Sequence, residues 1–243
     1  MTDLLYQTDS YLKEFDASVV AVEAETRAVI LDRTAFYPGG GGQPCDTGKL
    51  TIGGVTYPVE RLKKQGDNAL HFLGGAEPVE APPPAIRAAA HGQLDWEHRY
   101  QLMRTHTAMH ILCGVIFRDY SASVTGGDMQ PLKGRVDFEF ETMRAELIHA
   151  IETAVNREVQ NAREIRVNIL PRAEAFKIPD LIRTKINLLP EGIAQVRTVE
   201  IVGLDLQADG GTHVKNTSEV GHIRVVDYKS KGAINKRIYV EVE

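Results

Sequence analysis

Hydrophobic residues recur along the chain at two different spacings, and each spacing predicts a different kind of element. In the first ninety residues the apolar runs are short and separated by polar residues and glycine. These runs are residues 17–24, 27–31, 50–52 and 55–57. The pair Gly53-Gly54 separates the last two runs, and such a pair is typical of a two-residue hairpin. We therefore expect residues 1–90 to form a small antiparallel, β-barrel-like domain.

Two later segments have helical spacing. Asp95 can cap a helix that runs to about Phe117. A second helix is predicted where apolar residues recur every four positions, and Ile148 widens its apolar stripe. The residues of this stripe are Met143, Leu147, Ile151, Val155 and Val159.

Strict alternation of apolar and polar residues predicts strands in the second half of the chain, at 136–140, 165–169 and 238–242. Residues 77–84 carry four prolines and are expected to be a linker. The fold class predicted for residues 91–243 is α+β, with two layers in which helices pack on one face of an antiparallel sheet.

Composition and charge narrow the possible functions. The 243 residues carry a net charge of −5, which argues against indiscriminate binding of nucleic acid. No long apolar run and no signal-peptide pattern is present, so a cytoplasmic protein without a membrane partner is expected. Cys45 and Cys113 cannot form a disulfide framework. Cys113 could be a metal ligand, but we favour a small core residue.

The candidate chemistry begins with His106 and His110, which lie four residues apart in the first predicted helix. This spacing puts both imidazoles on one face, with Cβ atoms about 5–6 Å apart, near enough to hold one zinc ion. His213 follows Gly-Gly-Thr, where glycines allow the tight backbone of a ligand loop. A histidine pair is also common on helix surfaces and in cores, but the apolar face around this pair favours a metal site.

Thr107 argues against peptide hydrolysis. It follows His106 at the position where zinc peptidases of the His-Glu-x-x-His type carry their general base. The bond attacked should therefore be more labile than an amide, or the substrate should supply its own proton shuttle.

A glycine-rich segment, residues 34–48, contains four consecutive glycines followed by Gln43. It is not a phosphate-binding P-loop, because no Gly-Lys-Ser/Thr follows, and no nucleotide cofactor is expected. The run is either a flexible turn or a place where backbone approaches a ligand closely, with Gln43 offering both donor and acceptor.

Four motifs occur in a fixed order: Thr-x-Phe-Tyr-Pro-Gly-Gly-Gly-Gly-Gln from Thr34, His-Thr-Ala-x-His from His106, Gly-Gly-Thr-His ending at His213, and Asn-Lys-Arg ending at Arg237. Together they resemble the AlaX family of free-standing alanyl-tRNA editing proteins over essentially the whole chain. The resemblance implies a zinc-dependent hydrolase that acts in trans on tRNA(Ala) mischarged with serine or glycine. An aminoacyl ester is more labile than a peptide and adjoins a ribose hydroxyl, which agrees with the missing glutamate.

The chain departs from the family at one ligand. The usual fourth ligand is a cysteine four residues before the last histidine, and Asp209 stands there. A carboxylate oxygen binds zinc at about 2.0–2.2 Å but makes the site harder than a thiolate would. We favour Asp209 as a direct ligand of one zinc ion with His106, His110 and His213. It could instead orient an imidazole or the attacking water, or the site could have lost its metal.

The resemblance also suggests residues that contact the aminoacyl ester. Thr34 would read the serine hydroxyl, and Gln43 and Thr212 would line the pocket or steady the ester. Each also has an ordinary interpretation as a strand-end, surface or loop-capping residue.

For the tRNA we select a basic segment, residues 224–237, in which Asp227 is the one acidic residue. Its basic residues are Arg224, Lys229, Lys231, Lys236 and Arg237. Such a segment can bind phosphates on an acidic protein, although charged segments are commonly just solvated. The sequence predicts no particular oligomeric state.

Two other classes stay open. A non-catalytic tRNA-binding module would keep the fold while the changed ligand set binds no metal. An editing domain of the threonyl-tRNA synthetase type shares His-x-x-x-His, but usually has cysteine at the position of Asp209 and lacks the glycine-rich loop.

Overall fold

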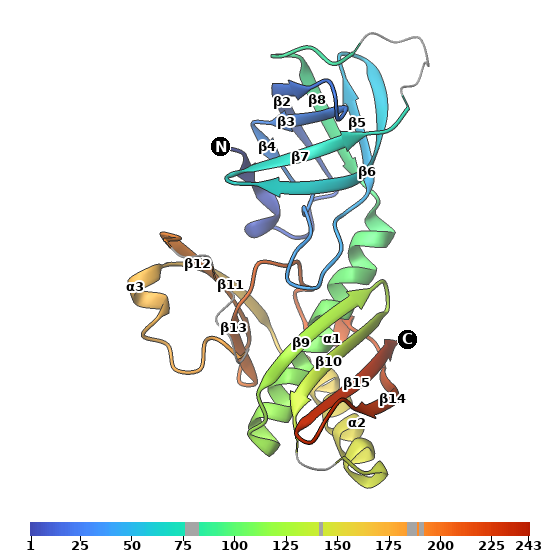
Figure 1. Ribbon diagram of the computed structural model, residues 1–243, viewed down its shortest axis with the longest axis vertical. Coiled ribbons are helices and arrows are strands. Elements are labelled where there is room, and N and C mark those ends of the chain that lie inside the picture. Colours follow the sequence, from blue (N-terminus) through green and yellow to red (C-terminus); the bar gives the residue numbers. More distant parts are fainter. Residues whose placement is uncertain (76–82, 141–142, 184–188, 190–191) are drawn as a thin grey trace. The chain divides into compact units, whose positions relative to one another are not determined.

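The computed structural model describes residues 1–75, 83–140, 143–183, 189 and 192–243 (Figure 1). The described chain divides into two compact units, Met1–Tyr100 and Gln101–Glu243. Most of the predicted linker lies outside the described residues.

The first unit contains a closed antiparallel barrel with the strand order β2-β3-β7-β6-β5-β8 (Figure 1). Its strands are β2 (Glu14–Glu23), β3 (Ala28–Leu31), β5 (Gly48–Ile52), β6 (Val55–Gln65), β7 (Asn68–Leu73) and β8 (Ala89–Leu94). Strand β8 pairs with both β2 and β5 and thereby closes the barrel. Strand β8 and the residues after it, up to Tyr100, belong to this first unit.

The predicted hairpin between β5 and β6 is confirmed. Gly53 and Gly54 have φ values of +58° and +86°, which is the left-handed region that a two-residue turn of type I′ requires. Leu50 on β5 and Val59 on β6 are both fully buried in the barrel core. The apolar positions of the two strands therefore point inwards, as the alternation requires.

Short elements precede the glycine-rich segment. Strand β1 (Asp3–Leu4) pairs in parallel with β4 (Arg33–Thr34), and the 3-10 helix η1 (Leu5–Gln7) follows β1. The glycine-rich segment then leads into strand β5 and not into a helix. This arrangement agrees with the exclusion of a P-loop.

Helices α1 (Trp96–Tyr120) and α2 (Ala145–Gln160) confirm the two predicted helices. The Asp95 carboxylate accepts a hydrogen bond from the backbone N–H of His98 at 3.1 Å, so Asp95 caps α1 as predicted. Most of α1 belongs to the second unit, where α2 buries Ile148, Ile151 and Val155. Within the described residues, no helix has the length and apolarity needed to cross a bilayer.

The main sheet of the second unit is antiparallel, in the order β14-β15-β10-β9. Its strands are β9 (Val124–Gln130), β10 (Lys133–Glu139), β14 (Ile223–Ser230) and β15 (Asn235–Val242). Helices α1 and α2 lie on one face of this sheet (Figure 1). Gly134 lets α1 approach β10 closely, since a Cβ atom there would lie 2.8 Å from the sulfur of Met109. The predicted α+β class is confirmed.

A second, three-stranded antiparallel sheet has the order β11-β12-β13. It consists of β11 (Ile165–Pro171), β12 (Gln195–Ile201) and β13 (Asp205–Ala208). The short helix α3 (Arg172–Ala175) follows β11, and the 3-10 helix η2 (Thr217–Glu219) precedes β14. The sequence predicted β11 but not β12 or β13. This sheet positions the site, because the chain leaves β13 directly into Asp209.

Candidate metal centre

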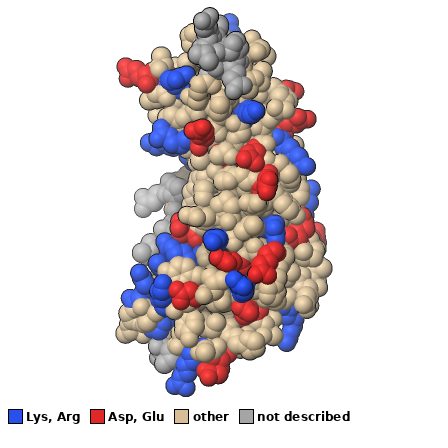
Figure 2. Space-filling model, turned by 90° about the vertical axis from the view of Figure 1, so that its right-hand side faces the viewer, with Lys and Arg blue, Asp and Glu red and all other residues tan. Residues whose placement is uncertain are grey.

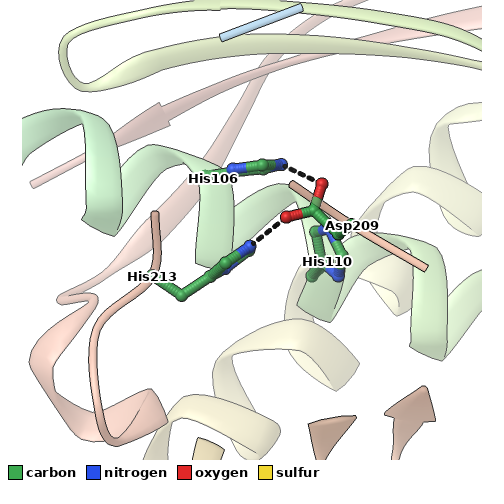
Figure 3. A group of neighbouring side chains, drawn as sticks. All are labelled: His106, His110, Asp209 and His213. Carbon is green, nitrogen blue, oxygen red and sulfur yellow. Dashed lines mark hydrogen bonds and ion pairs between the residues drawn. The ribbon is translucent and has the colours of Figure 1, made fainter. Parts of the chain in front are cut away.

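The four residues predicted as metal ligands come together in the second unit (Figure 3). Helix α1 supplies His106 and His110, and the segment after β13 supplies Asp209 and His213. One ligand atom from each side chain can be chosen so that all four atoms lie within 4.8 Å of one another. The structure thus joins two sequence motifs that are far apart in the chain.

The three imidazoles are buried against one another. The ring centroids of His106 and His110 lie 5.0 Å apart, as the spacing of four residues on one helix face predicts. The ring of His213 stacks on that of His106 with centroids 4.2 Å apart, and it lies 4.6 Å from the ring of His110. Three ring nitrogens can therefore face one small space.

Asp209 points its carboxylate at this space (Figure 3). Its Oδ2 lies 3.0 Å from Nε2 of His213, and its Oδ1 lies 3.5 Å from Nε2 of His106. The backbone N–H of Gly211 donates to Oδ2 at 2.7 Å, and a guanidinium N–H of Arg197 donates to the main-chain carbonyl of Asp209 at 3.0 Å. These hydrogen bonds hold the carboxylate among the histidines.

The donor types of the cluster suit one metal ion. Four ligands at about 2.1 Å from one tetrahedral ion lie about 3.4 Å apart, so cluster atoms as much as 4.8 Å apart would have to move about an ångström closer to bind the same ion. Three imidazoles and one carboxylate are nitrogen and oxygen donors that zinc accepts. The chemistry of the donor set therefore fits zinc.

The pKa shifts of His106, His213 and Asp209 favour the protonation states that can bind a metal ion. Burial lowers the pKa of His213 to about 4, and burial likewise lowers the pKa of His106 well below its ordinary value. Burial alone would raise the pKa of Asp209, but the neighbouring histidines hold it well below its usual range. A deprotonated carboxylate and neutral imidazoles are the forms that bind a metal.

His110 differs from the other two histidines. Burial lowers its pKa, but the Asp205 and Asp209 carboxylates outweigh this effect and raise the pKa above its ordinary value. The Nδ1 atom of His110 lies 3.4 Å from Oδ2 of Asp205. Asp205 itself was not predicted from the sequence, since nothing in the spacing connects it with a helix so much earlier in the chain.

Thr107, which stands where a zinc peptidase would carry glutamate, has a structural role. Its Oγ1 lies 3.1 Å from Nδ1 of His213 and accepts a hydrogen bond from the backbone N–H of Val214 at 3.3 Å. Thr107 thus ties the ligand loop to α1. Cys113, on the same helix, is buried outside the cluster, and burial raises the pKa of its thiol, so it is a core residue here.

The residues expected at the ester occupy defined places. Thr212 is fully buried between Gly211 and His213, in the ligand loop. Gln43 is buried in the first unit, where its main chain exchanges two hydrogen bonds with Gly40, of 3.0 and 2.9 Å. The glycine run is therefore a closed turn.

Thr34, also in the first unit, is fully buried and makes a hydrogen bond to His71 Nε2 at 2.8 Å. The other ring nitrogen of His71, Nδ1, lies 3.2 Å from the carbonyl of Val29. Because a carbonyl only accepts, Nδ1 carries the proton and Nε2 accepts from the Thr34 hydroxyl. The oxygen of Thr34 also accepts from the N–H of Phe36 at 3.2 Å, so its hydroxyl proton is committed to His71.

The basic segment forms the hairpin of β14 and β15, and several of its charges are paired. Arg237 makes two hydrogen bonds to Asp137, of 2.6 and 2.7 Å, and Lys229 lies 2.9 Å from Asp227. Lys236 is buried and donates to two turn carbonyls, while Arg224 lies 3.6 Å from two glutamates. On the face drawn in Figure 2, basic side chains lie among acidic ones. Lys231, at the turn, is exposed.

Comparison with known proteins places these features in a family. The sequence model described as "Threonyl and Alanyl tRNA synthetase second additional domain" matches residues 196–239, which include the ligand loop and most of the hairpin of β14 and β15. The model described as "tRNA synthetases class II (A)" matches residues 7–81.

Relatives match over nearly the full chain. The alanyl-tRNA editing protein AlaX-M of Saccharolobus solfataricus is 40% identical, with 100% of both chains covered. The protein of the same name from Methanosarcina acetivorans is 36% identical, with 98% of both chains covered. The alanine–tRNA ligase of Ignicoccus hospitalis is 37% identical over 93% of this chain and 24% of its own length. The chain therefore belongs to the AlaX family of alanyl-tRNA editing proteins.

Proposed function

We propose that this chain is a trans-editing hydrolase that removes serine or glycine from mischarged tRNA(Ala). The observation that carries the proposal is the buried cluster of His106, His110, Asp209 and His213, in a chain that belongs to the AlaX family. We further propose that the cluster holds one zinc ion with Asp209 as a direct ligand. The position of its carboxylate among the imidazoles supports this choice.

The residues have separate roles in this proposal. A zinc ion held by the cluster would supply Lewis-acid activation of the ester carbonyl or of the attacking water. Thr107 and Gly211 hold His213 and Asp209 in place through the hydrogen bonds described above. Thr34, Gln43 and Thr212 are proposed to contact the aminoacyl ester, as the family resemblance implies.

The substrate class follows from the limits of amino-acid selection. A synthetase pocket for alanine cannot exclude the smaller glycine and rejects serine poorly, so a second site must hydrolyse those products. The ester is labile, and the adjacent ribose hydroxyl can relay a proton. Hydrolysis of such an ester therefore does not need the glutamate that zinc peptidases carry at the position of Thr107.

Contact with the tRNA is proposed for the hairpin of β14 and β15. Lys229 and Lys231 are exposed there, whereas Lys236 and Arg237 are engaged within the unit and support the hairpin. Replacing Lys231 with alanine should then reduce the slope of log affinity against log salt for tRNA by about one. An unchanged slope would remove Lys231 from the interface.

The experiment that tests the activity compares seryl-, glycyl- and alanyl-tRNA(Ala) as substrates before chelation, after chelation and after adding zinc. Deacylation of at least one mischarged tRNA should exceed that of alanyl-tRNA(Ala), should be lost on chelation and should return with zinc. Binding of tRNA without deacylation of any substrate would instead support the non-catalytic module. Hydrolysis that chelation leaves unchanged would exclude the metal from the reaction.

A further inference from the structure

A buried carboxylate that the proposed reaction does not use lies beside the cluster. Asp205 begins β13, and its side chain is fully buried. Its Oδ2 lies 3.4 Å from Nδ1 of His110, which is long for a hydrogen bond but close enough for strong attraction between a carboxylate and a ring N–H. Among the described residues, this buried nitrogen makes no hydrogen bond of ordinary geometry.

Other side chains hold the Asp205 carboxylate in this position. The amide of Gln207 donates to Oδ2 at 2.6 Å, and Nε of Arg183 donates to Oδ1 at 3.2 Å. The guanidinium of Arg183 lies over the ring of Phe117, 3.7 Å from its centroid, so it is itself fixed against α1. The carboxylate therefore has a compensating charge and a fixed direction.

The backbone is also shaped to bring Asp205 to His110. Gly114 lies one helical turn after His110 on α1, and a Cβ atom at this position would come within 2.9 Å of Cβ of Asp205 and of Cγ of Leu204. A side chain at position 114 would push β13 away from the helix. Glycine here keeps the carboxylate within reach of the imidazole.

The two nitrogens of His110 consequently differ in their surroundings. Nδ1 faces a fixed carboxylate, which favours a proton on that atom, and this leaves the lone pair of Nε2 for the cluster. A carboxylate that orients a metal-binding histidine through its second nitrogen fixes the ring, selects the tautomer and raises the basicity of the ligand.

We propose that Asp205 is a positioning residue, which orients the imidazole of His110 and selects its tautomer so that Nε2 is presented to the metal. This inference rests on the proposed metal site but not on the identity of the substrate. A purely structural role is the competing explanation, in which Asp205 only neutralises the partly buried Arg183. The two explanations differ in what happens to a metal bound by protein that remains folded.

The test compares Asp205→Asn with Glu158→Gln. Glu158 is also a buried carboxylate of the second unit and contacts two arginines, Arg118 at 2.5 Å and Arg163 at 2.6 Å, but it is not among the cluster residues. Both variants remove one buried negative charge with little change of shape. The affinity of folded protein for zinc is measured by competition with a chromophoric chelator, and the visible absorption of the cobalt-substituted protein reports the ligand geometry.

Asp205→Asn should weaken zinc binding by about 10- to 100-fold and shift the cobalt absorption bands. Glu158→Gln should lower the stability and leave both metal readouts unchanged. Wild-type affinity and spectrum in folded Asp205→Asn would overturn the inference while leaving the metal site intact. If the wild-type protein itself binds no zinc, the proposed metal site is wrong, and the inference about Asp205 is overturned with it.

A second variant keeps the test usable if Asp205→Asn does not fold. Asp205→Glu retains the charge that Arg183 needs but moves the carboxylate by one methylene relative to His110. Weaker zinc binding with an altered cobalt spectrum in folded Asp205→Glu supports positioning. Wild-type values for both would show that only the charge matters, and would overturn the inference.

Discussion

Each of the two units buries a polar cluster, and the two clusters differ in how their charges are balanced. In the first unit, Arg99 and Asp46 are both fully buried. Arg99 directs its donors to the Asp46 carboxylate and to the carbonyls of Ser10 and Ala35. The backbone N–H of Tyr37 donates to the same carboxylate. One positive and one negative group satisfy each other, which is the arrangement of a structural ion pair.

In the second unit, the cluster of His106, His110, Asp209 and His213 gathers acceptors. The three imidazoles and the Asp209 carboxylate offer four possible ligand atoms that lie close together. Burying a carboxylate is unfavourable unless a positive charge compensates it, and a guanidinium nitrogen of Arg197 lies 3.7 Å from Oδ2 of Asp209. The comparison thus sets a buried ion pair with satisfied hydrogen bonds beside a cluster whose side chains could hold a metal ion.

The largest effect is expected from the cluster histidines. Replacement of any one of His106, His110 and His213 with alanine should abolish deacylation. This loss should exceed the roughly 100-fold loss that follows removal of a residue that only orients a ligand. His149→Ala is the matched control, because His149 is exposed on α2. Metal content and the single-turnover rate on seryl-tRNA(Ala) measure the effect. A cluster variant that kept the wild-type rate with metal bound would lose its place among the ligands.

The ion pair of the first unit should affect stability instead. Asp46→Ala leaves Arg99 buried without its partner and should lower the free energy of unfolding by about 3–5 kcal/mol. Denaturant titration measures this change, while metal content per folded molecule should stay at the wild-type value. Loss of the metal from Asp46→Ala that remains folded would contradict the distinction between the two clusters.

A buried histidine outside the cluster predicts a pH dependence. Burial lowers the pKa of His71 to about 4, against 6.5 as its ordinary value. As the pH falls through this interval the unfolded state binds the proton first, so stability present at pH 7 is lost progressively towards pH 4. At pH 5 the loss attributable to His71 should be about 2 kcal/mol. His71→Gln should remove this part of the pH dependence; an unchanged dependence in the variant would show that His71 does not cause it.

The smallest effect on the deacylation rate is expected at Thr34, whose hydroxyl already donates its hydrogen bond to His71. If its oxygen also accepts from the serine hydroxyl, Thr34→Val should narrow the discrimination between seryl- and alanyl-tRNA(Ala). One neutral hydrogen bond of about 0.5–1.5 kcal/mol corresponds to roughly 2- to 12-fold in relative rate. Glycyl-tRNA(Ala) is the internal control, because glycine has no hydroxyl. Equal losses on all three substrates would show that Thr34 supports the fold or the ester.

The sequence predicted the elements whose periodicity is local and regular. Helix α1, the hairpin at Gly53 and Gly54, and the histidine pair follow from spacings of two to four residues. Strand β12 was not predicted, because it buries four consecutive residues, including the polar Arg197 and Thr198. Its sequence therefore lacks the alternation of apolar and polar residues that predicts a strand.

The surroundings of the site could not be predicted from spacing, because they depend on contacts across the sheets and helices. Asp205 meets His110 only when β13 lies against α1. The basic segment likewise looked isolated in the sequence, but Asp137 on β10 pairs with Arg237 on the neighbouring strand. Counting charges along one segment cannot reveal a partner that another strand supplies.

Elemental analysis of purified protein that has never been exposed to a chelator tests the central claim most directly. Three histidines and an aspartate around one space predict about one equivalent of tightly held divalent metal, with zinc as the expected ion. A stoichiometry well below one, with no deacylation gained when zinc is added, would contradict the claim that this cluster is a metal centre.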